Sequence, residues 1–255
     1  MKPTARTIGF VTTVVAVAVT AIFGVAVGAS AAGPDLGTTA TATISVGTHN
    51  TLHGAATFHN LAGVIGWQEV DSTAARDKMR RQLGSEYAHY FPSEIPARAV
   101  PISWRVSRFR LLNVGFQRTH DGEAGVTPAR YIVWVSLEVR ETGKRFIFIN
   151  THFISGAWNA HPERQARWLK HYQILYNKVA RFRQYHPEKP IFVVGDFNRR
   201  KAMAMPSPIK WVPVKDVSGV PIDQIYAPSN ISHTRVARLF KWGSDHFAYR
   251  MYATF

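Results

Sequence analysis

Acidic, amide and imidazole side chains follow directly after several apolar stretches of this sequence. The clearest case is Asp196 and Asn198, which come after the apolar run Ile191–Gly195. In an extended chain, residues i and i+2 point to the same side, so these two side chains can face one ligand together. An Asx-type turn after a strand is the alternative explanation, because Asp and Asn are common turn residues.

Polar residues of the same kinds stand at the ends of other apolar segments. Asn50 ends an alternating segment that begins at Thr43, Glu69 follows the apolar run 61–67, and His152 ends a third segment. Ligand sites commonly form where the ends of neighbouring strands meet, so a shared ligand explains this repetition better than isolated surface residues do. The complete set of candidate site residues is Asn50, Glu69, His152, Asp196, Asn198, Asp223, Asp245 and His246.

The chemistry of this set favours a hard divalent cation. Carboxylate and amide oxygens prevail, and the sequence contains no cysteine. Such donors suit Mg²⁺ or Mn²⁺ rather than zinc. The absence of cysteine also excludes disulfides and a thiolate nucleophile. We expect no organic cofactor.

The apolar periodicity predicts many strands and two helices. Segment 190–195 has no polar break, which is typical of a strand buried on both faces. Segment 162–185 carries apolar residues at helical spacing and cations between them, and 73–83 is the second helix, capped by Asp71 or Ser72. The other expected strands are 43–50, 61–67, 100–105, 110–114, 130–139, 145–152, 222–226, 232–242 and 247–255.

The amino-terminal segment has the features of an export signal. Lys2 and Arg6 precede the apolar run 8–27, and Ala29-Ser30-Ala31 is a small-x-small cleavage pattern. We therefore expect a signal peptide at 1–31. The apolar run is also long enough to span a bilayer, so an uncleaved membrane anchor is the alternative. Either way the rest of the chain, secreted or membrane-anchored, lies outside the cytoplasm.

The remaining chain has the size and composition of one large domain. We expect a short linker at 32–42, rich in Gly, Ala and Thr, followed by a single domain at 43–255 that is a monomer. The 255-residue chain carries a formal charge of +15 and is 46% hydrophobic. This charge favours polyanionic partners, meaning a nucleic acid substrate or an anionic membrane surface.

Six short motifs occur in an order that resembles the endonuclease/exonuclease/phosphatase superfamily. That family includes pancreatic-type deoxyribonucleases, abasic-site endonucleases, sphingomyelinases and inositol-polyphosphate phosphatases. The resemblance covers the chain from residue 43 to its end and implies an α/β fold, a four-layered α/β sandwich with two mixed β-sheets packed face to face and helices outside. The motifs are Thr48-His49-Asn50, Gln68-Glu69-Val70, Asn150-Thr151-His152, Gly195-Asp196-Phe197-Asn198, Ile222-Asp223-Gln224-Ile225 and Ser244-Asp245-His246.

The resemblance also implies a role for each candidate residue. The residues that it implies as metal ligands are Asn50, Glu69 and Asp245. The catalytic residues are His152, Asp196, Asn198, Asp223 and His246. Within this scheme, Asp196 orients and deprotonates the attacking water, while the two histidines donate hydrogen bonds to phosphate oxygens. A histidine that pairs with a carboxylate tends to stay protonated near neutral pH.

The function that follows is an exported, Mg²⁺-dependent phosphodiesterase that acts on nucleic acid. A phospholipid head group, as in sphingomyelinases, or a phosphomonoester is the alternative substrate, and a non-catalytic basic module is a third hypothesis. Cations at Arg199-Arg200-Lys201 suit a phosphate backbone, whereas Arg130 is either a phosphate contact or a surface cation. Tyr131 is a weak candidate for the tyrosine of abasic-site enzymes, and the segment between Asn198 and Asp223 is short for recognition loops. We interpret the remaining histidines as structural.

Overall fold

The computed structural model describes residues 40–255. The predicted signal peptide or anchor at 1–31 lies outside these residues, as does most of the predicted linker. Within residues 40–255, no helix combines the length and apolarity that crossing a membrane requires.

The first sheet contains seven strands in the order β11-β13-β1-β2-β4-β3, with β12 also paired to β13. β1 pairs in parallel with β2 and antiparallel with β13, so the sheet is mixed. Its strands are β1 (Thr43–Asn50), β2 (Val64–Gln68), β3 (Tyr87–Tyr90), β4 (Ile102–Arg105), β11 (Ser232–His233), β12 (Ala237–Arg238) and β13 (Tyr249–Thr254).

The second sheet contains six strands in the order β5-β6-β7-β8-β10-β9. It is also mixed, because β7 and β8 are parallel while their outer neighbours β6 and β10 are antiparallel to them. Its strands are β5 (Phe109–His120), β6 (Arg130–Val139), β7 (Arg145–His152), β8 (Ile191–Asp196), β9 (Ile209–Trp211) and β10 (Asp223–Pro228).

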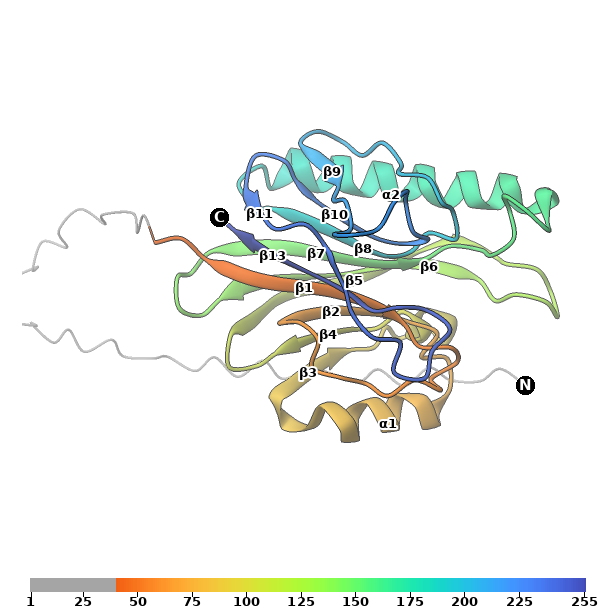
Figure 1. Ribbon diagram of the computed structural model, residues 1–255, viewed down its shortest axis with the longest axis horizontal. Helices are drawn as coiled ribbons and strands as arrows, with labels where there is room; N and C mark the ends of the chain where they lie inside the picture. Colours follow the sequence, from red (N-terminus) through yellow and green to blue (C-terminus); the bar gives the residue numbers. More distant parts are fainter. Residues whose placement is uncertain (1–39) are drawn as a thin grey trace, which may run out of the picture. The chain divides into compact units, whose positions relative to one another are not determined.

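Helices cover the outer face of each sheet. Helix α1 (Thr73–Leu83) packs on the first sheet, and helix α2 (Gln165–Tyr185) packs on the second. Figure 1 shows the resulting order of layers, which is α1, first sheet, second sheet and α2. The predicted four-layered α/β sandwich is confirmed. The hydroxyl of Ser72 caps α1 by accepting from the Ala75 amide at 3.0 Å.

Alternate residues of β7 and β8 face different cores, which explains their unbroken apolar sequences. The residues that face the first sheet are Phe146, Phe148, Phe192 and Val194. The residues that face α2 are Ile147, Ile149, Ile191 and Val193. All eight are at most 2% exposed, so both strands are buried on both faces, as β8 was predicted to be.

The expected strands differ from the observed ones at the edges of the sheets. β3 and β9 were not predicted, because four and three residues are too few to show a period. β5 continues to His120 instead of ending at 114, since most of its residues are partly or fully exposed and carry no alternating pattern. The single strand expected at 232–242 is wrong, and β11 and β12 are two short pieces there.

A buried asparagine joins the two sheets beneath the candidate site. The Asn150 side-chain amide on β7 donates to the carbonyl oxygens of Trp67 at 2.7 Å and Pro101 at 3.0 Å. Its Oδ1 accepts from Gln68 Nε2 at 2.7 Å. Because Glu69 follows Gln68 and His152 follows on β7, these bonds fix the two candidate residues relative to each other.

We expect Asn150→Ala to lower the free energy of unfolding by about 3 kcal/mol, because it leaves buried amide and carbonyl groups without partners. Urea unfolding measures this loss. The control is Asn177→Ala, since Asn177 is exposed on α2 and bonds only to Gln173. Equal stability of the two variants would contradict the role given to Asn150.

Candidate active site

Three candidate residues stand in one row across the second sheet. His152 is the register partner of Asp196 in the parallel pair β7–β8. Asp196 is in turn the partner of Asp223 in the antiparallel pair β8–β10. Paired residues of adjacent strands project to the same face, so the pairing alone places an imidazole beside two carboxylates at this edge.

The first sheet supplies Asn50 and Glu69 to the same place. Asn50 ends β1 opposite Gln68, and Glu69 is the next residue after β2. The Asn50 side-chain amide donates to Glu69 Oε1 at 3.1 Å and to Asp196 Oδ2 at 3.1 Å. One amide therefore holds two carboxylates that belong to different sheets.

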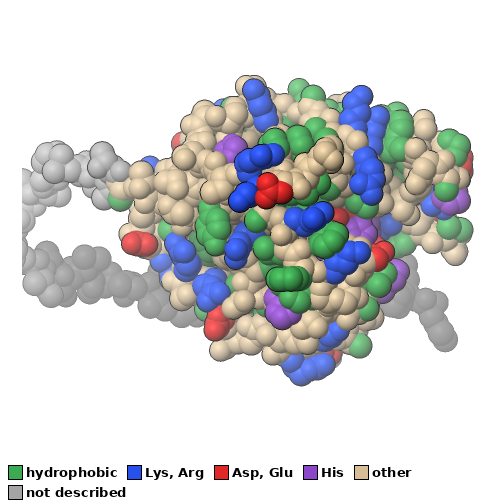
Figure 2. Space-filling view, viewed as in Figure 1, with side chains coloured by type: hydrophobic (Ala, Val, Ile, Leu, Met, Phe, Trp, Pro, Cys, Tyr) green, Lys and Arg blue, Asp and Glu red, His purple; other side chains and the backbone are tan. Residues whose placement is uncertain are grey.

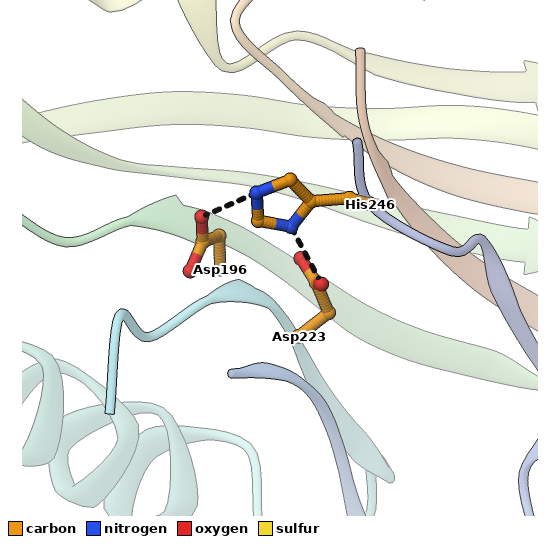
Figure 3. A group of neighbouring side chains, drawn as sticks. All are labelled: Asp196, Asp223 and His246. Atoms are coloured by element: carbon orange, nitrogen blue, oxygen red, sulfur yellow. Dashed lines mark hydrogen bonds and ion pairs between the residues drawn. The ribbon is translucent and has the colours of Figure 1, made fainter. Parts of the chain in front are cut away.

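His246 reaches the row from the loop before β13. Its Nδ1 lies 2.8 Å from Asp223 Oδ2, and its Nε2 lies 4.0 Å from Asp196 Oδ2 (Figure 3). The hydroxyl of Ser244 ties this loop to β1 by donating to the Asn50 carbonyl at 2.7 Å. Asp245 Oδ1 is 3.8 Å from His246 Nε2.

The structure brings all eight candidate residues together. His152 Nε2 lies 3.5 Å from Asp196 Oδ2 and 3.9 Å from Glu69 Oε1, which closes the set around Asp196. The Asn198 amide N–H donates to Asp196 Oδ1 at 2.7 Å, while the Asn198 side chain donates to the Phe153 carbonyl at 3.0 Å. The Asx-type turn and the shared site are thus both present.

Gly195 allows β7 and β8 to approach closely just before Asp196. Its φ is +148°, and a Cβ at this position would lie 2.1 Å from the Thr151 carbonyl oxygen. Any side chain here would push the strands apart. The glycine that ends the apolar run therefore sets the distance between His152 and Asp196.

Left-handed backbone conformations gather at the site. Among the described residues other than glycine, six have positive φ, and these include Leu52, His53, Glu69 and Asn198. Glu69 has φ +62°, a conformation that costs on the order of 1 kcal/mol for such a residue. Strain of this kind persists where surrounding bonds enforce it, and it concentrates at functional sites. Here the His53 amide donates to Glu69 Oε2 at 3.0 Å.

The electrostatics of the row assign different protonation states to its members. Burial and the nearby charge of Asp223 raise the pKa of Asp196 to about 7, against the opposing effects of His246 and the Asn198 amide. Burial alone would lower the pKa of His246, but its hydrogen bond to Asp223 and the surrounding carboxylates raise that pKa to about 9. Near pH 8 the row therefore holds an Asp196 carboxylate beside a His246 imidazolium.

His152 differs from His246 in its protonation state. Burial first, and then the positive charge of Arg130, hold the pKa of His152 well below its usual range. Its Nε2 lies too far from Asp196 for a hydrogen bond at 3.5 Å. His152 is therefore neutral and can donate through only one ring N–H.

Arg130 is a partly buried cation whose charge acts on the carboxylates of the site. It is the first residue of β6, and burial lowers its pKa while the charges of Asp196 and Glu69 act against that. Its Nε atom is buried and has no hydrogen-bond partner among the described residues. The next residue, Tyr131, donates its hydroxyl to Glu94 Oε2 at 2.5 Å.

The residues fit a divalent cation of the expected type. Atoms of Asp196, Asp223 and His246 lie within 4.8 Å of one another, as metal ligands would. A protonated imidazole has no lone pair for a metal, however, so the pairing of His246 with Asp223 favours the carboxylate oxygens instead. Glu69 and Asp196 meet at the Asn50 amide, and Asp223 Oδ1 is buried without a hydrogen-bond partner among residues 40–255. An ion at Glu69 would offset this negative charge.

Sequence reasoning missed several residues that shape the site. Asn150 belongs to a quoted motif, but only the structure shows that its amide bridges the sheets. His53 was interpreted as structural, yet its Nδ1 lies 2.6 Å from Asp71 Oδ2 and its Nε2 lies 3.8 Å from Glu69 Oε2. Strain at His53 and Glu69 has no sequence signal, because neither residue is a glycine.

Comparisons with known proteins find solved structures that share this fold. No protein-family model matches the sequence, and no curated protein matches it. An endonuclease/exonuclease/phosphatase family protein from Bacteroides thetaiotaomicron matches with a TM-score of 0.68 and 14% identity, over 85% of this chain and 99% of its own. A mannosyl-6-phosphatase from the same organism has a TM-score of 0.63 and 13% identity, over 82% and 98%.

A third neighbour is D. rerio TDP2 complexed with a single-strand DNA product. It has a TM-score of 0.62 and 16% identity, over 83% of this chain and 98% of its own. At these identities the likeness concerns the fold. The fold that the six motifs implied is therefore confirmed, and the chemistry depends on the residues of the site.

Proposed function

We propose that this protein is an exported Mg²⁺- or Mn²⁺-dependent phosphodiesterase that hydrolyses nucleic acid. The observation that carries the proposal is the meeting of Asp196, a carboxylate whose pKa is about 7, with His246, an imidazolium whose pKa is about 9. In-line attack by water is assisted by a base that takes the proton of the water and by a cationic donor to the non-bridging phosphate oxygens. Export is supported by residues 1–31 of the sequence.

The residues of the site divide the chemistry between them. Asp196 accepts a proton from the attacking water, and the amides of Asn50 and Asn198 fix its two oxygens. His246 donates from Nε2 to a non-bridging phosphate oxygen, while Asp223 holds its Nδ1. Negative charge grows on these oxygens in the transition state, so the donors stabilise that state more than the bound substrate. The Arg130 guanidinium adds a further positive charge.

A bound divalent cation would supply Lewis-acid stabilisation of the phosphate. Glu69, with Asn50 and Asp245, would hold it. We expect Glu69→Gln to raise the Mn²⁺ concentration needed for half-maximal activity by about 10- to 100-fold, the range seen when groups that bind or orient a metal are altered. Isothermal titration with Mn²⁺ checks this independently of activity. Unchanged Mn²⁺ affinity would show that the ion lies elsewhere.

Nucleic acid is the substrate that the charge and one neighbour favour. The formal charge of +15 suits a phosphate backbone. The D. rerio neighbour holds a single-strand DNA product. The second candidate is a phosphomonoester, which the mannosyl-6-phosphatase neighbour supports. A phospholipid head group is the remaining alternative.

A substrate panel tests the proposal. The protein is incubated with Mg²⁺ or with EDTA, and with plasmid DNA, single-stranded DNA, RNA, sphingomyelin vesicles or a sugar phosphate. We expect EDTA-sensitive cleavage of at least one nucleic acid. If EDTA-sensitive hydrolysis released only inorganic phosphate, the substrate would be a phosphomonoester and not nucleic acid. If it released only phosphocholine, the substrate would be a phospholipid head group. No hydrolysis of any ester would contradict the proposal as a whole.

A further inference from the structure

Two adjoining cavities extend the candidate site along the surface. The first, of about 410 Å³, is lined by Asp223 and His246 of the site. The second, of about 490 Å³, reaches the site at Asn198. Arg200 and Ile222 line both cavities, so the two hollows meet at these residues.

Cations line both cavities without carboxylate partners. They are Arg199, Arg200, Lys201, Arg238 and Lys241. Within residues 40–255, none of the five forms an ion pair with a carboxylate. Figure 2 shows Lys and Arg side chains spread over the viewed face, with few Asp and Glu side chains among them. Gathering like charges is unfavourable, and a bound anion would offset it.

Aromatic rings hold three of these cations in place. Arg199 lies over the Trp158 ring at 3.6 Å from its centroid. Arg238 and Lys241 lie over the Phe247 ring at 4.7 and 4.9 Å. Cation–π contacts restrict side chains without neutralising them, so their charge stays available to a ligand.

We propose that Arg200, Arg238 and Lys241 bind a phosphate of the substrate other than the one that reacts, so that the substrate is a polynucleotide. This inference rests on the proposed function. By the proposed function the reacting phosphate binds at His246 Nε2 beside Asp196, and the three cations line the same cavity as His246 and Asp223. A sugar monophosphate or a choline head group carries no second phosphate. The three cations are exposed, and they line the same cavity as His246 and Asp223, which favours a substrate that extends into the site over a flat membrane surface.

The test compares two phosphodiesters in the presence of Mg²⁺. Bis(4-nitrophenyl) phosphate has one phosphate, and a short single-stranded oligonucleotide has many. In the double variant Arg238→Gln/Lys241→Gln, we expect the ratio of kcat/KM for the oligonucleotide to that for bis(4-nitrophenyl) phosphate to fall on the order of 10-fold. Each lost phosphate contact lowers the salt slope of log kcat/KM by about 0.7 for single strands, so we expect a fall of about 0.7 for the one phosphate that these cations share.

The matched control removes the same charge elsewhere. Lys170 and Lys210 are exposed and line neither cavity, so Lys170→Gln/Lys210→Gln should keep the wild-type ratio and salt slope. A wild-type ratio and slope in Arg238→Gln/Lys241→Gln would overturn the inference and leave the proposed function standing. Failure of wild type to hydrolyse either compound would instead overturn the proposed function. If Arg238→Gln/Lys241→Gln lost as much activity on vesicles of sphingomyelin and phosphatidylserine as on the oligonucleotide, the cations would bind a membrane. That result would overturn the inference that the substrate is a polynucleotide.

Discussion

Asp196→Asn is expected to lower kcat for oligonucleotide cleavage by about 10³-fold, the middle of the range for losing a general base. Asparagine has the same shape but cannot accept the proton of water at neutral pH. Asp196 is 1% exposed, and two amide groups hold its oxygens in place. Single-turnover rates at saturating Mg²⁺ measure the loss.

A stability measurement on Asp196→Asn distinguishes a loss of catalysis from a loss of folded protein. Because the pKa of Asp196 is raised in the folded protein, its contribution to stability is present below its ordinary pKa and is lost as pH rises through about 7. At pH 8 the carboxylate therefore costs stability, and Asp196→Asn should unfold at a urea concentration no lower than wild type.

The control is Asp216→Asn, since Asp216 is exposed, has φ +56° and makes no ion pair among the described residues. This variant should keep wild-type activity. A kcat within tenfold of wild type for Asp196→Asn would exclude Asp196 as the base.

The second large effect concerns His246. Wild-type kcat/KM should rise as Asp196 loses its proton near pH 7 and fall as His246 loses its proton near pH 9, which gives a maximum near pH 8. His246→Gln should lower kcat by about 10²–10³-fold, the cost of one donor to a developing oxyanion. It should also remove the alkaline fall.

Asp223→Asn tests why His246 stays protonated up to about pH 9. Its carboxylate is the main group that raises the pKa of His246 against the effect of burial. Without it, the alkaline limb should move to lower pH, and the acid limb should also move to lower pH because the charge of Asp223 helps to raise the pKa of Asp196. A pH profile measured with bis(4-nitrophenyl) phosphate avoids effects of pH on oligonucleotide binding. An alkaline limb that stays near pH 9 would show that another group is responsible.

Much of the fold could be predicted because the inner strands are long and apolar. β7 and β8 are buried on both faces, and a run such as Ile191–Val194 leaves little choice of structure. The edge strands could not be predicted, because three or four partly exposed residues carry no period. β9 and β3 are identified only by their pairing with β10 and β4 in the structure.

The candidate site could be assembled from the sequence as a set of residue types, and its internal arrangement could not. Asn50, His152 and Asp196 could be predicted because they are the polar residues that end the apolar strands β1, β7 and β8. Distances across two sheets have no local signal, so the sequence left two interpretations of Arg130 open, and the structure shows that it is partly buried. Burial and the charge of Arg130 also make His152 neutral, which no local feature of the sequence indicates.

The most direct test of the site is anomalous diffraction from crystals of Asp196→Asn grown with Mn²⁺ and an oligonucleotide. We expect an Mn²⁺ peak with the Glu69 carboxylate among its ligands, and a backbone phosphate within hydrogen-bond distance of His246 Nε2. A second phosphate should lie at Arg200, Arg238 and Lys241. An ion away from Glu69, or an oligonucleotide whose phosphates avoid His246, would contradict it.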